Sequence, residues 1–227
     1  MKIVECVDVS KTYRQGKIAV EALKTITLSI DKGDFVAVAG PSGSGKTTLL
    51  NLIGGLDRLD SGRIVVDGKS IEQMSASALA RLRLYRVGFV FQAYNLIPVL
   101  SAEENVEFVM LLQGIPAPER RRRARAVLDE VGLGGKYRRR PAELSGGQQQ
   151  RVAVARAIVS NPSIVLADEP TANLDSKTGN GLLEMMQRMN TEKNVTFIFS
   201  THDKMVMDYA RRIILLHDGC LQQDRMK

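Results

Sequence analysis

Short runs of uninterrupted apolar residues alternate with amphipathic stretches along the chain, and this pattern predicts an α/β fold. Residues 35–39, Phe-Val-Ala-Val-Ala, and similar runs at 164–167 and 196–199 have the composition of parallel strands covered on both faces. Residues 25–30 alternate polar and apolar positions, as a half-buried strand does. Asp67-Gly68 lies between two short β-rich stretches within residues 63–71, which predicts a hairpin.

The middle of the chain has helical rather than strand periodicity. From about Ala93 to Pro141 this periodicity is broken only by prolines and glycines, and β-type runs return after Ile164. We therefore predict one domain over residues 1–227. Residues 93–151 form an inserted helical subdomain, and residues 1–92 and 152–227 form the core with an antiparallel N-terminal part.

Composition narrows the classes of protein that fit. The 227 residues are 44% hydrophobic, enough for a core without metal or disulfides, and Cys6 and Cys220 form no metal-binding pair. Aromatic residues are 5% with no Trp, which argues against an aromatic platform for nucleic acid. No apolar run approaches the roughly 18 residues that span a bilayer. Within residues 1–10, acidic residues stand where a signal peptide needs an apolar block. We expect the chain to remain inside the cell.

The positive charge is concentrated in one segment. Lys and Arg total 32 against 25 Asp and Glu, and residues 119–140 alone hold nine basic and three acidic residues. The interpretation that we favour is a solvated helix face that begins near Pro118 and ends near Gly132. Its apolar stripe would be Ala124, Val127, Leu128 and Val131. A dedicated anion site, or contact with anionic lipid headgroups, is the alternative.

Residues 40–47, Gly-Pro-Ser-Gly-Ser-Gly-Lys-Thr, match the phosphate-binding pattern G-x-x-x-x-G-K-[ST]. The segment lies between the apolar run at 35–39 and a helical stretch from Thr48, the context that this loop requires and that a chance match lacks. Lys46 is expected to reach the β- and γ-phosphates, and the Thr47 hydroxyl to hold Mg²⁺. The predicted nucleotide contacts of this segment are Gly40, Ser42, Gly43, Ser44, Gly45, Lys46, Thr47 and Thr48.

Two acids follow the apolar run at 164–167. Asp168, at the tip of a central strand, is expected to face the phosphate loop and to hold Mg²⁺. Glu169 is expected to polarise an attacking water. Such a pair alone is more often an ordinary loop feature, but a preceding phosphate loop reverses that preference. A nucleotide with a polyphosphate chain, together with Mg²⁺, is the predicted ligand.

Residues 144–151, Leu-Ser-Gly-Gly-Gln-Gln-Gln-Arg, resemble the signature of the ATP-binding-cassette (ABC) ATPases. Other motifs of that family follow in its order: Tyr13, where the family places an aromatic against adenine, Gln92 after the run 87–91, Asp175 in Ala-Asn-Leu-Asp, and His202 in Ser-Thr-His-Asp. The resemblance covers essentially the whole chain. It implies a P-loop NTPase (RecA-like) core, an N-terminal antiparallel β-subdomain and an inserted α-helical subdomain that carries the signature.

The resemblance also implies roles for these residues. Two chains would sandwich two ATP molecules, with the signature residues Ser145, Gly146, Gly147 and Gln148 closing over the γ-phosphate held by the partner. Asp175 would lie where the two chains meet, and His202 would hold the γ-phosphate and water in register with Glu169. Gln92 would be a catalytic and metal-binding residue at the joint with the helical subdomain. The residues themselves favour an anion-seeking helix terminus here, because Ser145 and the glycines lie just before a helix that is predicted from Val152.

Details of the signature, of Thr-Ala-Asn173-Leu-Asp and of residues 93–107 are similar to cassettes of the lipoprotein-releasing and macrolide-efflux group. This similarity implies the ATP-hydrolysing homodimeric subunit of an ABC transporter at the cytoplasmic face of the inner or plasma membrane. It would be attached there through a separate permease with a large extracytoplasmic domain, without nucleic acid. A cassette of another transporter branch, and a soluble ABC ATPase acting on nucleic acid or ribosomes, are alternatives. A GTPase switch is disfavoured, since it has no use for the signature.

Overall fold

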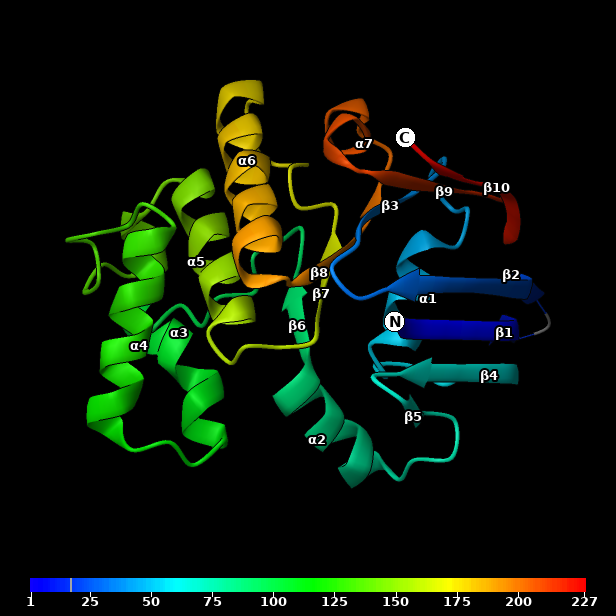
Figure 1. The fold of residues 1–227 in the computed structure, drawn as a ribbon, viewed down its shortest axis with the longest axis horizontal. Helices are drawn as coiled ribbons and strands as arrows, with labels where there is room; N and C mark the ends of the chain where they lie inside the picture. The colour runs from blue at the N-terminus through cyan, green and yellow to red at the C-terminus, as the bar shows by residue number, and fades with distance from the viewer. Residues whose placement is uncertain (17) are drawn as a thin grey trace.

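A six-stranded sheet forms the centre of the molecule, in the order β10-β9-β3-β8-β7-β6 (Figure 1). The computed structural model describes residues 1–16 and 18–227. Five strands run parallel and the edge strand is antiparallel: β3 (Phe35–Ala39), β6 (Val87–Val90), β7 (Ile164–Asp168), β8 (Thr196–Thr201), β9 (Arg212–His217) and antiparallel β10 (Cys220–Met226). Every residue of β3 and β8 is buried, which is why continuous apolar runs predicted them correctly.

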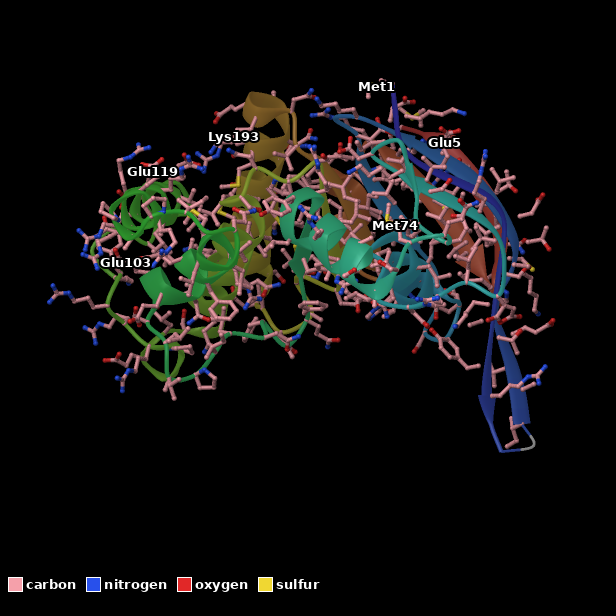
Figure 2. All side chains as sticks on the ribbon, turned by 90° about the horizontal axis from the view of Figure 1, so that it is seen from below. Met1, Glu5, Met74, Glu103, Glu119 and Lys193 are labelled. Atoms are coloured by element: carbon pink, nitrogen blue, oxygen red, sulfur yellow. The ribbon has the colours of Figure 1, made fainter. Side chains whose placement is uncertain are left out.

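A second, antiparallel sheet has the order β2-β1-β4-β5. It consists of β1 (Lys2–Gln15), β2 (Ile18–Asp31), β4 (Ser61–Val66) and β5 (Lys69–Ser70). The predicted hairpin at 63–71 is confirmed as β4 and β5, joined by Asp67 and Gly68 with φ of 48° and 73°. The paired ends of β1 and β2 project beyond the rest of the molecule (Figure 2). Cys6 is buried in this sheet, and burial raises the pKa of its thiol to about 12.

Helix α1 (Lys46–Ile53) contacts strands of both sheets, and it begins at Lys46, within the phosphate-binding motif, two residues before the predicted start at Thr48. Gly45 precedes it with φ of 99°, and a Cβ there would lie 2.4 Å from the carbonyl oxygen of Ala22, so only glycine fits. Helix α2 (Ala76–Arg86) leads into β6. Helices α6 (Ser176–Lys193) and α7 (Lys204–Tyr209) pack against each other after β7 and β8, and α7 also contacts β3.

Three helices pack together on one side of the central sheet (Figure 1): α3 (Ala102–Leu112), α4 (Ala117–Glu130) and α5 (Gly146–Ile158), with a short 3₁₀ turn at Pro141–Glu143. Helix α4 has Pro118 in its first turn and ends before Gly132, whose φ is 76°, as predicted. Its apolar stripe faces inward, since Ala124 and Leu128 are fully buried.

Helix α5 begins at Gly146, not at Val152 as the sequence predicted. The reason is a capping box: Ser145 Oγ accepts from the Gln148 N–H, and Gln148 Oε1 accepts from the Ser145 N–H at 3.1 Å. These two bonds stabilise a first helical turn that two consecutive glycines would otherwise weaken. The signature glycines therefore lie inside the helix.

The arginines of α4 are largely paired with carboxylates of α3 and α4. Glu119 accepts from Arg122 at 2.8 Å and from Arg123 at 2.6 Å, and these bonds lower its pKa to about 2. Glu103 accepts from Arg125 at 2.9 Å. Side chains ending in nitrogen gather around the labelled Glu103 and Glu119 (Figure 2). This pairing favours a solvated helix face over a dedicated anion site.

Among the helices described, none combines the length and the apolar character that crossing a membrane requires.

Candidate nucleotide site

A cavity of about 420 Å³ brings together most of the predicted site residues. The phosphate loop, the carboxyl ends of β7 and β8, Gln92 after β6, and the β1–β2 hairpin form its walls. Its lining residues are Tyr13, Val20, Ala22, Ser42, Gly43, Ser44, Gly45, Lys46, Thr47, Thr48, Gln92, Asp168, Glu169 and His202. Carboxyl ends of parallel strands are where α/β folds place their ligand sites.

The phosphate loop wraps around the side chain of Lys46. Its ammonium donates to the carbonyl oxygens of Gly40 and Pro41, both at 2.8 Å, and only 7% of the residue is exposed. Burial lowers the pKa of Lys46, while the charges of Glu169 and Asp168 act in the opposite direction. The hydroxyl of Ser44 is buried and has no partner among the described residues. A buried cation and an orphan hydroxyl in one loop suit a polyphosphate.

Oxygen donors converge beside this loop. The Thr47 hydroxyl donates to Asp168 Oδ1 at 3.0 Å, and Gln92 lines the same cavity. The described residues form no cluster of three or more His, Cys, Asp or Glu side chains that could cage a metal alone. A small number of protein oxygens beside a phosphate loop suits Mg²⁺, because this ion takes its other ligands from phosphate and water. The residues therefore fit Mg²⁺.

Glu169 has an unusual backbone conformation at the end of β7. Its φ is 46°, and its N–H donates to the carbonyl oxygen of Ser200 at 2.9 Å. One carboxylate oxygen lies 2.7 Å from His202 Nδ1, and the other accepts from the Thr201 hydroxyl at 3.3 Å. The Glu169 side chain is 14% exposed and that of His202 is 67% exposed. A sheltered carboxylate and an accessible imidazole thus share one wall of the cavity.

Tyr13 also lines the cavity, and its side chain is held by neighbouring charged residues. Its hydroxyl donates to Asp57 Oδ2 at 2.7 Å, while Lys11 Nζ donates to Asp57 Oδ1 at 3.1 Å and lies 5.1 Å from the ring centroid. Burial and the bond to Asp57 raise the pKa of Tyr13. Neither Lys11 nor Asp57 is predicted as a site residue from the sequence. They meet across 46 positions of the chain, and no local pattern signals such a contact.

Gly40 of the phosphate loop, the signature residues and Asp175 are not among the residues that line this cavity. Ser145 caps α5, and Asp175 caps α6 by accepting from the backbone N–H groups of Lys177 and Thr178. The side-chain bond from Thr178 is the main cause that lowers the pKa of Asp175. The structure therefore places one predicted set of residues in the cavity and the other set outside it.

Two further side chains link these parts. Gln150, fully buried on α5, donates to the carbonyl oxygen of Pro170 at 2.8 Å, directly after Glu169. Asn173 donates to the carbonyl oxygen of Gln92 at 3.0 Å. Gln150 belongs to the signature and Asn173 to the Ala-Asn-Leu-Asp motif, but their partners depend on the tertiary fold.

A parallel sheet with a glycine-rich loop between β3 and α1, and carboxylates at the end of β7, defines a P-loop NTPase. The family model of the ABC transporters matches residues 23–172, and the chain belongs to this family as an ATP-binding cassette. The predicted family and fold are thereby confirmed, and the chain is an ABC ATPase.

Relatives agree over the whole chain. An uncharacterized ABC transporter ATP-binding protein of Thermotoga maritima is 46% identical over 97% of this chain and 94% of its own length. The macrolide export ATP-binding/permease protein MacB of Syntrophobacter fumaroxidans is 47% identical over 99% of this chain, which spans 32% of that relative. The cassette MJ0796, solved as a dimer in a post-hydrolysis state with ADP and Pi, superposes with a TM-score of 0.91 at 42% identity and 98% coverage of both chains.

Proposed function

We propose that this cassette works as a homodimer with two composite ATP sites and hydrolyses Mg²⁺-bound ATP to drive a membrane permease of the macrolide-efflux or lipoprotein-release type. The observation that carries the proposal is the split site: phosphate loop and carboxylates share one cavity, whereas Ser145 and Asp175 lie outside it. A second copy can supply the missing half, and MJ0796 is a dimer. The named relatives are transport proteins, which supports the transporter over a ribosomal or nucleic-acid role.

In this proposal the cavity binds ATP along its length. Tyr13 stacks on adenine, and Lys46 binds the β- and γ-phosphates. The remaining phosphate contacts come from loop N–H groups and hydroxyls, at Gly40, Ser42, Gly43, Ser44, Gly45, Thr47 and Thr48. Ser145, Gly146, Gly147 and Gln148 of the second copy close over the γ-phosphate. The N–H groups of Gly146 and Gly147, in the first turn of α5, have no acceptor within the helix and can bind the anion, while Ser145 and Gln148 pair with each other in the capping box. Asp175 lies where the copies meet.

The metal site follows from the same residues. Thr47, Asp168 and Gln92 would hold Mg²⁺ together with phosphate oxygens. Bound there, the ion would neutralise negative charge on the phosphates. The protein orients these oxygens, and the hydrogen bond from the Thr47 hydroxyl to Asp168 keeps the two side chains next to each other.

Hydrolysis needs a water aligned with the γ-phosphorus. Glu169 accepts a hydrogen bond from that water and polarises it, while the oxygen forms its bond to phosphorus and the bond to the bridging oxygen of ADP breaks. His202 holds Glu169 at 2.7 Å and contacts the γ-phosphate with its other ring nitrogen. The left-handed backbone of Glu169, fixed by Ser200, keeps the carboxylate at this position.

A groove of about 580 Å³ between α2, β6, α3 and α5 is the proposed permease contact. Its walls are mostly apolar and include Leu84, Phe89 and Leu112, and Leu111 beside it is half exposed. Asn95 lines the groove and lies three positions after Gln92, so a segment docked there contacts the loop that reaches the ATP cavity. Patches of this kind mark contact with a partner.

The Glu169→Gln variant tests the ATPase part. It should retain ATP affinity, lose about 10²–10⁴-fold in turnover because an amide polarises water poorly, and elute with ATP and Mg²⁺ at twice the monomer mass. Glu192→Gln, an exposed position on α6, is the matched control and should hydrolyse ATP normally. Wild-type turnover in Glu169→Gln would remove this residue from catalysis, and a monomer at saturating ATP would contradict the composite site.

The permease part needs a separate experiment. Tagged Glu169→Gln, incubated with ATP and Mg²⁺ in detergent-solubilised native membranes, should retain a membrane protein with a large extracytoplasmic domain. Leu112→Glu in the groove should abolish that capture, whereas Met226→Glu, equally apolar and exposed on β10, should not. Recovery of ribosomes or nucleic acid instead would favour the alternative function.

A further inference from the structure

The first turn of α6 packs directly against the signature glycines of the same chain. A Cβ atom at Gly147 would lie 2.3 Å from Thr178 Cγ2, well inside the 3.0 Å that real Cβ atoms essentially never cross. Leu174 closes the same space, with its Cδ2 at 3.9 Å. Position 147 therefore has no room for a side chain, even before any second copy approaches.

Thr178 cannot easily move aside. Its hydroxyl donates to Asp175 Oδ2 at 2.6 Å, and its N–H donates to Asp175 Oδ1 at 3.0 Å. Threonine is branched at Cβ, so rotation about χ1 that withdraws Cγ2 also breaks the hydroxyl bond. The Thr178 methyl group, which packs against Gly147, is thus held in a fixed position relative to the carboxylate of Asp175.

The same segment also reaches the loop of Gln92. Asn173 donates to the Gln92 carbonyl oxygen, and the Tyr94 hydroxyl lies 2.8 Å from the place of a Cβ at Gly146. Residues 173–178 consequently contact both the signature turn and the start of the loop that enters the ATP cavity. A displacement of the signature turn would therefore also move residues 173–178 and the start of this loop.

We propose that Thr178 is a positioning residue of the ATPase, which fixes the signature turn at Gly147 relative to Asp175 so that both meet the second copy together. The inference rests on the proposed composite site. In this view position 147 requires glycine for two reasons: a side chain there would collide with Thr178 of the same chain, and its absence lets backbone N–H groups approach a phosphate.

A rescue experiment tests this coupling. Gly147→Ala should lower ATPase turnover at least tenfold, although alanine is the better helix former. Adding Thr178→Ser removes the colliding Cγ2 and keeps the hydroxyl for Asp175, and it should recover at least fivefold of that loss. Thr178→Val keeps the branch and removes the hydroxyl, so it should give no recovery. Thr191→Ser, an exposed threonine on the last turn of α6, is the matched control and should also fail.

A second readout separates positioning from folding and from the proposed function. In the Glu169→Gln background, Gly147→Ala should abolish ATP-dependent dimerisation, keep the affinity of the monomer for a fluorescent ATP analogue, and regain the dimer with Thr178→Ser. Full activity of Gly147→Ala, or no recovery by serine in a protein with native Tm, overturns the role of Thr178. A Glu169→Gln protein that never dimerises overturns the composite site and this inference with it.

Discussion

The hydroxyl of Tyr13 donates a 2.7 Å hydrogen bond to Asp57 Oδ2, which fastens the aromatic ring lining the proposed ATP cavity to the segment after α1. The other oxygen of Asp57 holds Lys11, whose ammonium lies 5.1 Å from the ring centroid. The ring is therefore oriented before a nucleotide arrives. Orientation in advance reduces the ordering cost that binding would otherwise carry.

Removing this hydrogen bond should weaken ATP binding while the ring remains. We expect Tyr13→Phe and Asp57→Asn to raise the Kd for ATP by about 3–10-fold, the effect of one hydrogen bond of about 1 kcal/mol. Tyr13→Ala, which also removes the stacking surface, should raise it further. Calorimetric titration measures all three. Asp60→Asn is the control, because it keeps a side-chain oxygen for the Thr12 N–H and lies 3.8 Å from Lys11 without a bond to Tyr13. Equal weakening by Asp60→Asn would contradict a specific role for Asp57.

Lys46→Ala should weaken ATP binding itself, since it removes a buried cation from the phosphate loop. A charge-assisted hydrogen bond contributes about 1.5–3 kcal/mol, so we expect a rise in Kd of about 10–100-fold. Calorimetry checks this directly. Unchanged affinity would remove Lys46 from the phosphate site.

ATP affinity should also depend on alkaline pH. Burial lowers the pKa of Lys46, so its ammonium deprotonates at a lower pH than that of an exposed lysine. The protonated form binds phosphate, and affinity should therefore fall as pH rises through the lowered pKa. Titrations between pH 7 and 10 measure the effect, and Lys46→Arg should abolish the pH dependence because a guanidinium stays charged. A flat profile in the wild-type protein would contradict this assignment.

Charge reversal of Arg121, Arg122 and Arg123 to glutamate should leave the ATPase activity of the purified protein intact. These side chains are exposed, pair with Glu103 and Glu119, and lie outside the cavity. Loss of turnover in a variant with a nearly native Tm would instead make this segment part of the catalytic assembly.

The sequence predicted the parts whose signals are local. The run at 35–39 and the loop at 40–47 are adjacent along the chain, so strand, loop and α1 followed from residue order alone. The hairpin of β4 and β5 followed from Asp67-Gly68, which adopt the left-handed turn that this pair favours.

The remaining features depend on contacts between distant segments. The predicted start of α5 at Val152 was wrong. Two consecutive glycines have low helix propensity, and the capping box of Ser145 and Gln148 stabilises the first turn in spite of them. The support of Tyr13 by Asp57 and the packing of Thr178 on Gly147 join segments about 30 or more positions apart, and no periodicity reports them.

The buried Cys6 and the half-buried Cys220 differ in how a thiol reagent can reach them. Only a thiolate reacts, and a pKa of about 12 leaves almost none at Cys6 near neutral pH. The folded chain should consequently take up one equivalent of reagent, at the start of β10. Modification of Cys6 by a second equivalent requires β1 to leave its sheet. The rate of that modification therefore measures how often the sheet that carries Tyr13 opens.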